Sequence, residues 1–443
     1  MVESTSSSIR FAASPRPVEA TFDLEALTSD GGLVWLREAD DALGLSSAFA
    51  AEIREWRRRP GRHALVTLVQ QRLYQIACGY EDQNDATTLR HDPLLKQACG
   101  RLPLTGAPLA SQPTLSRLEN AVDRRSCYRL AVALVELYLR ERERDGVPTR
   151  ILLDLDGTAD PVHGEQEGSG YHGYFRQHMY HPLVIYDGDT DQLITAVLRP
   201  GASHASRGIV SILKRLIPAL QQRWPGVAIE LRADSGFAIP ALYDSCEANA
   251  ISYTIGLAPN GRLDALAAPL LDRALAEATE TDAKVRLIGE TAYQAGSWEQ
   301  ERRVVYKAEA LAKGPNTRFV VTNRPAAVSA QTVYDEYVDR GEPENWIKDL
   351  KNHCFADRLS CHTFVANQFR LLLHAAVYWL LDTLRRWLLR AGMERIQLDT
   401  LRLRLLKIGG WVREVATIVR LHLAERHPGR PLWALLAARP GRS

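Results

Sequence analysis

The sequence predicts an α/β fold in which a mixed sheet is flanked by helices and bordered by helical regions at both ends of the chain. Three observations lead to this prediction. Residues 20–147 repeat apolar side chains at helical spacing, as in ALVTLVQQRLYQIACGY. After Pro148, short β-rich runs alternate with helical runs, and from about residue 328 the spacing is helical again. A chain of 443 residues is long enough for two or three domains.

The N-terminal part of the chain is expected to be helical after a polar start. Residues 1–19 are rich in serine and proline, and we expect them to be disordered. Further along, LASQPTLSRLENAV predicts a short helix that carries Arg117. Ser111 or Thr114 would cap the start of this helix. The pattern is compatible with a helix-turn-helix element, although an ordinary helical hairpin explains it at least as well.

The central part of the chain predicts strands and helices in alternation. The expected elements are a strand at 151–158, a hairpin at 178–201 with its turn at Asp187-Gly188-Asp189, a helix at 206–224, a strand at 227–237, a helix at 239–250 and a strand at 252–257. Three more strand-like runs lie within residues 260–327, which we expect to form an all-β insertion. Helix returns at 329–340 and continues through 344–351. The remainder, to about Arg426, is expected to be helical and basic.

Charge is distributed unevenly along the chain. The formal net charge is +2, from 55 Lys and Arg against 53 Asp and Glu. From Arg370 to Ser443 there are 14 Lys and Arg and 5 Asp and Glu, a local charge of 14 − 5 = +9. The remainder therefore carries 2 − 9 = −7. A basic tail and an acidic body suit a protein that binds phosphates in one region and metal ions in another, although a solvated basic helical face would also give the basic tail.

Several classes of protein are disfavoured by composition. The six cysteines form no CxxC pair, which indicates reduced thiols in a cytosolic protein rather than a disulfide framework. No signal peptide is recognised at the start. The very apolar run at 362–389 is interrupted by Arg370, His374 and Asp382, so we expect a buried amphipathic helix and no membrane span.

Acidic residues at strand ends are the first candidates for chemistry. Asp154 and Asp156 alternate with leucines, so both carboxylates lie on one face of their strand. Asp234 follows IELRA at the end of a second strand. Carboxylates that converge repel one another unless they hold a cation. Ligands made only of oxygen suit Mg²⁺ or Mn²⁺.

A helix after the insertion supplies a third carboxylate. Glu344, Lys348 and Lys351 are spaced i, i+4, i+7, so one helical face carries a carboxylate and two ammonium groups. Pro343 suits the first turn of such a helix, and Gly341 suits its entry. The pattern fits a metal ligand beside phosphate-binding groups. Taken alone, it fits a solvated, salt-bridged helix face better.

The motifs together resemble those of a known family. The spacing Tyr337-x2-Arg340-x3-Glu344-x6-Lys351 is similar to the signature of a large clade of DDE insertion-sequence transposases. The segments DLDGTADPVHGEQEG, RADSGF and RGEPENWIKDLK look like one branch of that clade, the thirteen-eighty group of bacterial insertion sequences. The resemblance covers about residues 20 to 430.

The resemblance implies a ribonuclease-H-like catalytic core with a metal triad of Asp156, Asp234 and Glu344. Two Mg²⁺ ions are implied, which Mn²⁺ can replace. The site residues implied or suggested for phosphate and DNA binding are Tyr337, Arg340, Lys348 and Lys351.

The implied activity is metal-dependent cleavage of double-stranded DNA at terminal inverted repeats, followed by transfer of the 3′-hydroxyl ends into target DNA. The resemblance also implies a homodimer on paired ends, in the cytoplasm of a bacterium and associated with its nucleoid. The expected domains are a disordered start at 1–19, a helical DNA-binding domain at 20–147, a catalytic core at 148–259 and 328–365 interrupted by the insertion at 260–327, and a basic helical region at 366–443.

Three alternatives remain open from the sequence. LLDLDGT also matches the opening motif of haloacid-dehalogenase-like phosphatases, in which Asp154 would be the nucleophile and Asp156 the general acid. The chain could also be an inactive DNA-binding relic, although all three carboxylates are present. The run HCFADRLSCH invites a zinc site, but its spacing matches no usual zinc pattern.

Overall fold

The structure, a computed structural model, describes residues 9–11, 16–59, 61–311 and 314–439. The chain divides into two compact units, each assembled from segments that are distant in sequence. The first unit comprises Met1–Ala42, Pro60–Ser116 and Leu380–Ser443, and the second comprises Leu43–Arg59 and Arg117–Trp379. This division follows long-range packing, whereas the domain boundaries predicted above follow the order of elements along the chain.

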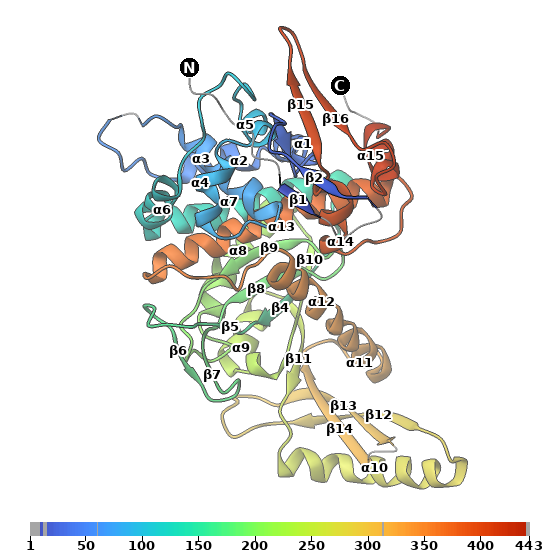
Figure 1. The fold of residues 1–443 in the computed structure, drawn as a ribbon. Helices are drawn as coiled ribbons and strands as arrows, with labels where there is room; N and C mark the ends of the chain where they lie inside the picture. The colour runs from blue at the N-terminus through green and yellow to red at the C-terminus, as the bar shows by residue number, and fades with distance from the viewer. Residues whose placement is uncertain (1–8, 12–15, 60, 312–313, 440–443) are drawn as a thin grey trace. The chain divides into compact units, whose positions relative to one another are not determined.

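The second unit is built on an eight-stranded mixed sheet (Figure 1) with the strand order β12-β13-β14-β11-β10-β4-β8-β9. The strands are β4 (Arg150–Gly157), β8 (Leu183–Asp187), β9 (Leu193–Val197), β10 (Ala228–Ala233), β11 (Ser252–Leu257), β12 (Val285–Tyr293), β13 (Arg302–Leu311) and β14 (Gly314–Thr322). Strands β4, β10 and β11 run parallel, and their other neighbours in the sheet are antiparallel. The predicted strands and the β8–β9 hairpin are confirmed.

Helices of the second unit form where the apolar spacing predicts them. Helix α8 (Ile209–Arg223) buries Leu213, Leu216 and Leu220, whose spacing of three and four residues places them on one face. Helix α9 (Pro240–Ala248) begins with a proline in its first turn. A backbone N–H at that position has no partner within the helix, so proline, which lacks one, loses no hydrogen bond there. The predicted α/β class, with a mixed sheet flanked by helices, is confirmed.

The expectation of an all-β insertion at residues 260–327 is wrong in one respect. Its three strands form, but Gly261–Thr281 is a helix, α10, of 21 residues. Asn260 caps this helix by accepting from the backbone N–H groups of Arg262 and Leu263 at 3.1 and 3.2 Å. The three strands also continue the main sheet, because β14 pairs with β11. The segment is therefore an α/β extension of the core sheet.

The segment that carries the third carboxylate is helical throughout but changes type. It consists of α11 (Ala330–Val338), a 3-10 turn (Asp339–Gly341), α12 (Glu342–Lys348) and a π-helical turn (Asp349–His353). Ser329 caps α11 by accepting from the Thr332 N–H at 3.1 Å. A proline lies in the first turn of α12, as predicted.

The N-terminal helices confirm the helical prediction for this region. They are α1 (Leu33–Leu43), α2 (Leu45–Glu52), α3 (Leu65–Ala77), α4 (Ala86–Leu89), α5 (Pro93–Ala98), α6 (Gln112–Ala121) and α7 (Arg124–Arg142). Helix α6 starts directly after Ser111 and contains Arg117, so the predicted short helix forms. The expected disorder at 1–19 is wrong for β1 (Ile9–Phe11) and β2 (Val18–Ala20), which pair antiparallel. Residues 1–8 and 12–15 lie outside the described residues.

The C-terminal region is not helical throughout, which corrects the prediction. Helices α13 (Phe364–Arg390), α14 (Leu398–Leu401) and α15 (Arg430–Ala437) form, but Gly410–Glu414 and Val419–Leu423 are strands β15 and β16. They make a hairpin, and β15 also pairs with β3 (Leu27–Thr28). In VRLHL apolar and basic residues alternate with period two, and in GWVRE burial alternates with the same period, which marks strands.

The first unit joins the two ends of the sequence by close backbone packing. The N–H groups of Gly31 and Gly32 donate to the carbonyls of Ile408 and Leu406 at 2.7 and 3.1 Å. A Cβ at Gly32 would lie 2.2 Å from the carbonyl oxygen of Leu405, so only glycine fits there. Among the helices in the described ranges, none has the length and apolar character that crossing a bilayer requires.

Candidate active site

Strand register brings two of the predicted carboxylates together. Strands β4 and β10 are parallel neighbours in which Leu155 pairs with Ala233. One residue further along each strand stand Asp156 and Asp234, which are therefore level with each other. Because side chains alternate along a strand, both carboxylates lie on the face opposite to these two apolar residues. The two aspartates thus converge at the carboxyl ends of adjacent parallel strands.

Asp156 is the buried member of the group. Its exposed fraction is 9%, and its Oδ1 accepts the Gly157 N–H at 2.7 Å. Burial raises the pKa of Asp156 to about 6, and the negative charges of Asp234 and Glu344 act in the same direction against the Arg340 guanidinium. A charge that raises a pKa must lie close to the group that titrates. The charges of Asp234 and Glu344 thus both act on Asp156.

Asp234 and Glu344 are held in different ways. Asp234 lies at the start of a 3-10 turn and accepts the Gly236 N–H at 2.8 Å, which fixes the orientation of its carboxylate. Glu344 is an exposed residue in the first half of α12. Two of the three predicted carboxylates thus lie at strand ends and the third lies on a helix.

Tyr337 and Arg340 lie beside these carboxylates. The Arg340 Nη1 donates to Asp156 Oδ2 at 3.4 Å, and the Arg340 guanidinium is 5.9 Å from the centre of the Tyr337 ring. Burial raises the pKa of Tyr337, and the charge of Asp234 raises it further, whereas Arg340 lowers it. These two residues of the predicted phosphate-binding set therefore face the carboxylate group.

The two lysines of the predicted set differ in their surroundings. Lys348 is exposed at the end of α12. Lys351 donates to the Ala159 carbonyl and lies 3.7 Å from Asp160, which is in β5 (Asp160–Pro161). Burial raises the pKa of Asp160 to about 8 while Lys351 opposes that rise. Lys351 thus ties the π-helical turn to the strand after β4, which the sequence does not indicate.

Two further groups near Asp156, Arg199 and His181, are absent from the sequence prediction. Arg199 is 4% exposed, and burial lowers its pKa to about 10 although Asp156 and Asp234 oppose the shift. The Nδ1 of buried His181 lies 2.8 Å from the Ser203 carbonyl. A Cβ at Gly157 would lie 2.7 Å from His181 Nε2 and 3.0 Å from Arg199 Nη2. Both groups therefore stand next to the residue that follows Asp156.

Comparison with known proteins assigns the chain to a family. The family model described as "Transposase DDE domain group 1" matches residues 12–440, almost the whole chain. The chain belongs to this family. It is a transposase of the DDE type, an enzyme class that cleaves DNA with divalent metal ions.

Two other comparisons set the transposase against curated proteins and against solved structures. No curated protein matches it. A solved structure titled "Cryo-EM structure of piggyBac transposase synaptic complex with hairpin DNA (SNHP)" matches with a TM-score of 0.43 and 12% identity, over 94% of this chain and 87% of that chain. The predicted family is thus confirmed by the family model.

The phosphatase alternative has no support in the transposase. Asp154, its proposed nucleophile, is 1% exposed and binds Arg232 through both oxygens, at 2.8 and 2.7 Å. A carboxylate held by a buried guanidinium fork is not free to attack a substrate. Arg232 also donates to the Glu336 carbonyl at 2.6 Å, so the pair links β4 and β10 to α11. Asp154 is a structural residue.

The donor set of the transposase fits a divalent cation. Carboxylate oxygens are the ligands preferred by Mg²⁺ and Mn²⁺. The negative charges of Asp234 and Glu344 raise the pKa of Asp156, and a bound cation would relieve this repulsion between carboxylates. Among the residues that the structure describes, no three acidic, histidine or cysteine side chains are already gathered closely enough to hold a metal ion. Asp156, Asp234 and Glu344 would provide the ligands.

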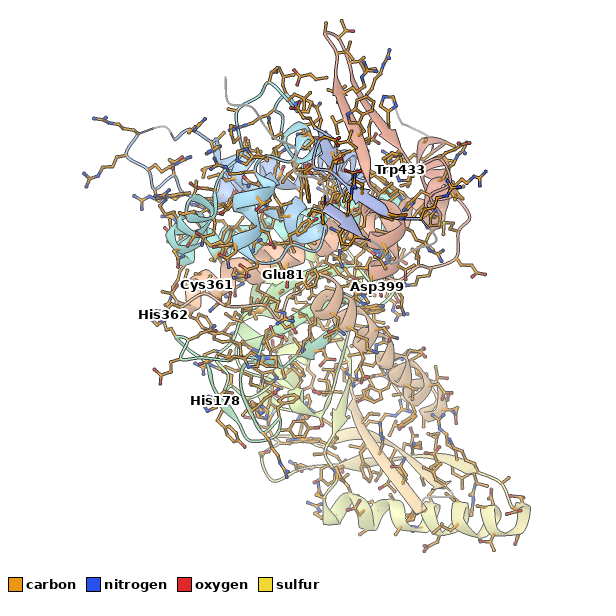
Figure 2. The ribbon with its side chains drawn as sticks, in the orientation of Figure 1. Glu81, His178, Cys361, His362, Asp399 and Trp433 are labelled. Carbon is orange, nitrogen blue, oxygen red and sulfur yellow. The ribbon has the colours of Figure 1, made fainter. Side chains whose placement is uncertain are left out.

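The run HCFADRLSCH has other contacts. His353 Nδ1 lies 2.9 Å from Asp349, Cys354 is buried, and the Cys361 thiol points to Glu119. Cys361 and His362 follow one another just before α13 (Figure 2). Each of these contacts has an ordinary structural explanation.

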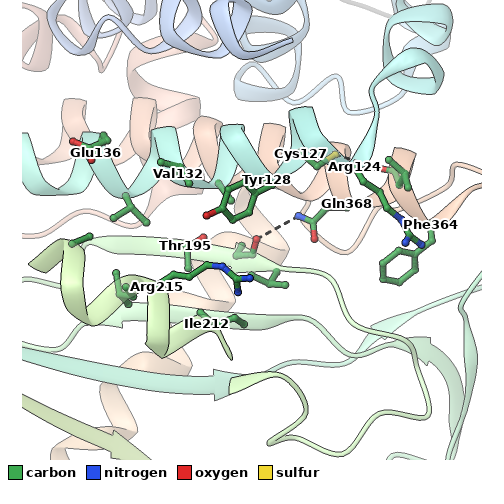
Figure 3. A pocket seen from close by; sticks show the side chains of 17 residues that line it. Arg124, Cys127, Tyr128, Val132, Glu136, Thr195, Ile212, Arg215, Phe364 and Gln368 are labelled. Carbon is green, nitrogen blue, oxygen red and sulfur yellow. Dashed lines mark hydrogen bonds between the residues drawn. The ribbon is translucent and has the colours of Figure 1, made fainter. Parts of the chain in front are cut away.

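An apolar cavity of about 480 Å³ lies elsewhere in the second unit (Figure 3), between α7, α8 and β9. Its walls include Tyr128, Val132, Thr195, Ile212, Arg215 and Gln368. None of the three carboxylates lines it. The cavity and the carboxylate group are therefore separate features.

The backbone of Gly256 packs closely against the Tyr337 hydroxyl, and this contact gives a first prediction. A Cβ at this residue would lie 2.6 Å from the Tyr337 hydroxyl and 2.9 Å from the Ser235 backbone nitrogen. We expect Gly256→Ala to displace Tyr337 and the turn that orients Asp234, and to lower the rate of strand cleavage roughly 10- to 100-fold. Single-turnover cleavage assays would measure this. Gly296→Ala, where a Cβ meets nothing within 4 Å, is the control and should leave the rate unchanged.

Proposed function

We propose that this transposase cleaves double-stranded DNA at terminal inverted repeats and joins the 3′-hydroxyl ends to target DNA at the Asp156–Asp234–Glu344 site. The observation that carries the proposal is the register of β4 and β10, which sets Asp156 level with Asp234. The effect of Asp234 and Glu344 on the pKa of Asp156 supports Glu344 as the third member. We assign two Mg²⁺ ions to these ligands, with Mn²⁺ as a substitute.

The carboxylates act as metal ligands in this proposal. When bound, the cations activate the attacking hydroxyl group and stabilise the oxygen that leaves the phosphorus. Asp156 must be deprotonated to serve as a ligand, and its raised pKa means that without a cation it gives up its proton around pH 6. The hydrogen bond from Gly236 keeps Asp234 oriented. Each step is an in-line displacement that needs no covalent intermediate on the protein.

Tyr337, Arg340, Lys348 and Lys351 bind the DNA phosphates in the proposal. Arg340 lies nearest to the reacting group, because it already contacts Asp156. Its planar guanidinium can donate two hydrogen bonds to one phosphate, which fixes the strand beside the carboxylates. Lys348 is exposed and free to reach a phosphate further along. Lys351 does so only if it releases the Ala159 carbonyl.

The DNA partners and assembly follow from the same reaction. Residues 20–147 and the basic region 366–443 hold the transposon ends, and the core holds the cleaved strand. Two copies of the chain act together, because joining both ends requires two sites in one complex. We place the reaction on the bacterial nucleoid in the cytoplasm, where both the element and its target DNA lie.

Metal dependence tests the proposal. Full-length protein is mixed with a duplex that carries the inverted repeats flanking its gene. We expect nicking at the repeat ends with Mg²⁺ or Mn²⁺ and none in EDTA. The sign of the pH effect is fixed: because protons compete with metal for Asp156, the apparent metal affinity should fall as pH drops below about 6. Cleavage that persists in EDTA would refute the metal mechanism. Release of phosphate from a small phosphomonoester, without nicking of the DNA, would favour the phosphatase hypothesis.

A further inference from the structure

The β15–β16 hairpin of the first unit has two unlike faces. Gly410 pairs with Leu423, Val412 with Leu421 and Glu414 with Val419 on one face. Trp411 pairs with His422 and Arg413 with Arg420 on the other. Directly opposed residues of an antiparallel pair point to the same side of the sheet. The hairpin therefore carries an apolar face and a face of aromatic and basic groups.

The apolar face is fixed to the body of the first unit. Val412 is 1% exposed. The carboxylate of Glu414 accepts the backbone N–H groups of Leu104 and Thr105 at 2.7 and 3.2 Å and the Thr105 hydroxyl at 2.5 Å. These bonds lower the pKa of Glu414, which keeps it charged and bound at neutral pH. The hairpin is consequently held in one orientation and its other face is presented to solvent.

The solvent face is built for contact with another molecule. Trp411 is 43% exposed, its ring lies 5.4 Å from that of His422, and the Arg413 guanidinium is 5.3 Å from its centre. Arg413 and Arg420 are exposed and directly opposite each other. Exposed tryptophan beside arginine is a composition that marks binding surfaces.

The two arginines repel each other without a compensating anion. Like charges directly opposite across two strands are destabilising. Within the described ranges neither Arg413 nor Arg420 is paired with a carboxylate, because Glu414 points to the opposite face and is occupied there. An anionic partner relieves this repulsion. The exposed basic groups of this face, Arg413, Arg420 and His422, point to a partner of negative charge.

We propose that the solvent face of the β15–β16 hairpin binds the backbone of duplex DNA, with Arg413 and Arg420 donating to phosphates and Trp411 packing against the sugars between them. A two-stranded ribbon fits a DNA groove in width. The contact carries no base readout, since both arginines address the phosphates. The inference deepens the proposed function by naming a DNA-binding surface, and it rests on that function only for the choice of duplex DNA as partner.

Salt dependence of binding tests the hairpin. Full-length protein is titrated onto a fluorescent 20-base-pair duplex of random sequence in EDTA, at a series of salt concentrations, so that no cleavage can occur. Each phosphate contact contributes about 0.9 to the slope of log Kobs against log salt. We expect Arg413→Ala/Arg420→Ala to reduce that slope by about 1.8, equally for two unrelated sequences. Trp411→Ala should weaken binding several-fold with the slope unchanged.

Two controls make the result specific. Arg413→Lys/Arg420→Lys keeps both charges and should retain the slope. Arg262→Ala/Arg273→Ala removes two exposed arginines from α10 and should also retain it. An unchanged slope in the hairpin alanine variant, or an equal fall in the α10 variant, would overturn the proposal. The proposal would also be overturned if light scattering showed a changed oligomeric mass for the hairpin alanine variant while its slope stayed the same. That result would make the hairpin a protein interface.

The outcome is separable from that of the cleavage reaction. A lower slope in the hairpin alanine variant, together with a wild-type protein that never nicks repeat ends in Mg²⁺, would refute the proposed function and leave the hairpin contact standing. A wild-type protein that nicks the ends, together with an alanine variant of unaltered slope, would refute the hairpin contact alone.

Discussion

Asp234→Asn should abolish strand cleavage while DNA binding persists. The substitution keeps the shape of the side chain and its bond from Gly236, but it removes one of the negative charges that hold the cations. Loss of one member of a catalytic group that acts as a unit reduces the rate roughly 10³-fold or more. The measurement is Mg²⁺-dependent nicking of end-bearing DNA, with binding followed in parallel by anisotropy in EDTA.

Asp335→Asn is the matched control for this expectation. Asp335 lies on α11 and pairs with Arg286 at the surface, at 3.2 Å, so its loss removes the same charge without touching the site. Its nicking rate should equal that of the wild type. Mg²⁺-dependent nicking retained by Asp234→Asn at more than a tenth of the wild-type rate would remove Asp234 from the metal site.

Arg232→Met should destabilise the protein strongly. The side chains of Asp154 and Arg232 are 1% and 8% exposed, and the substitution leaves the carboxylate buried without its partner. Breaking a buried pair on one side costs about 3–5 kcal/mol. The free energy of unfolding, from denaturant melts, measures this cost. Activity should fall as well, because Arg232 also binds α11 through the Glu336 carbonyl.

Two variants show that the effect belongs to the buried pair. Arg286→Ala breaks an exposed pair to the same helix, whose side chains are 34% and 52% exposed, and it should change stability by less than about 1 kcal/mol. Asp154→Asn added to Arg232→Met removes the unpaired charge and should restore part of the stability. If Arg232→Met and Arg286→Ala cost the same, burial of the pair does not contribute to stability.

The sequence predicts the strand positions of the candidate aspartates. The period of two in LLDLDG places Asp154 and Asp156 on one face, and RAD repeats that spacing on the neighbouring strand with Arg232 and Asp234. What the sequence does not show is the register. Once Leu155 faces Ala233, Arg232 neutralises Asp154, and Asp156 is left beside Arg340 and Asp234.

Other features escape prediction because their cause lies far away in the chain. Helix α10 packs on β12 and β13 and contains an internal proline, which obscures its local signals, the Asn260 cap and the buried Leu263 and Ala267 four residues apart. The β15–β16 hairpin is half apolar because it packs on residues near Gly31 and Thr105. Arg199 and His181 join the site through the β8–β9 hairpin, and no local spacing marks them.

The segments of the two units are completed at different times during synthesis on the ribosome. All residues of the second unit have been synthesised once Trp379 is complete, whereas the first unit still lacks Leu380–Ser443. The backbone at Leu405 and Leu406, against which Gly31 and Gly32 pack, is among the last to emerge. A nascent chain therefore contains the residues of its carboxylate site before it contains all the residues of the first unit. A chain that ends before Leu405 would lack the backbone against which Gly31 and Gly32 pack.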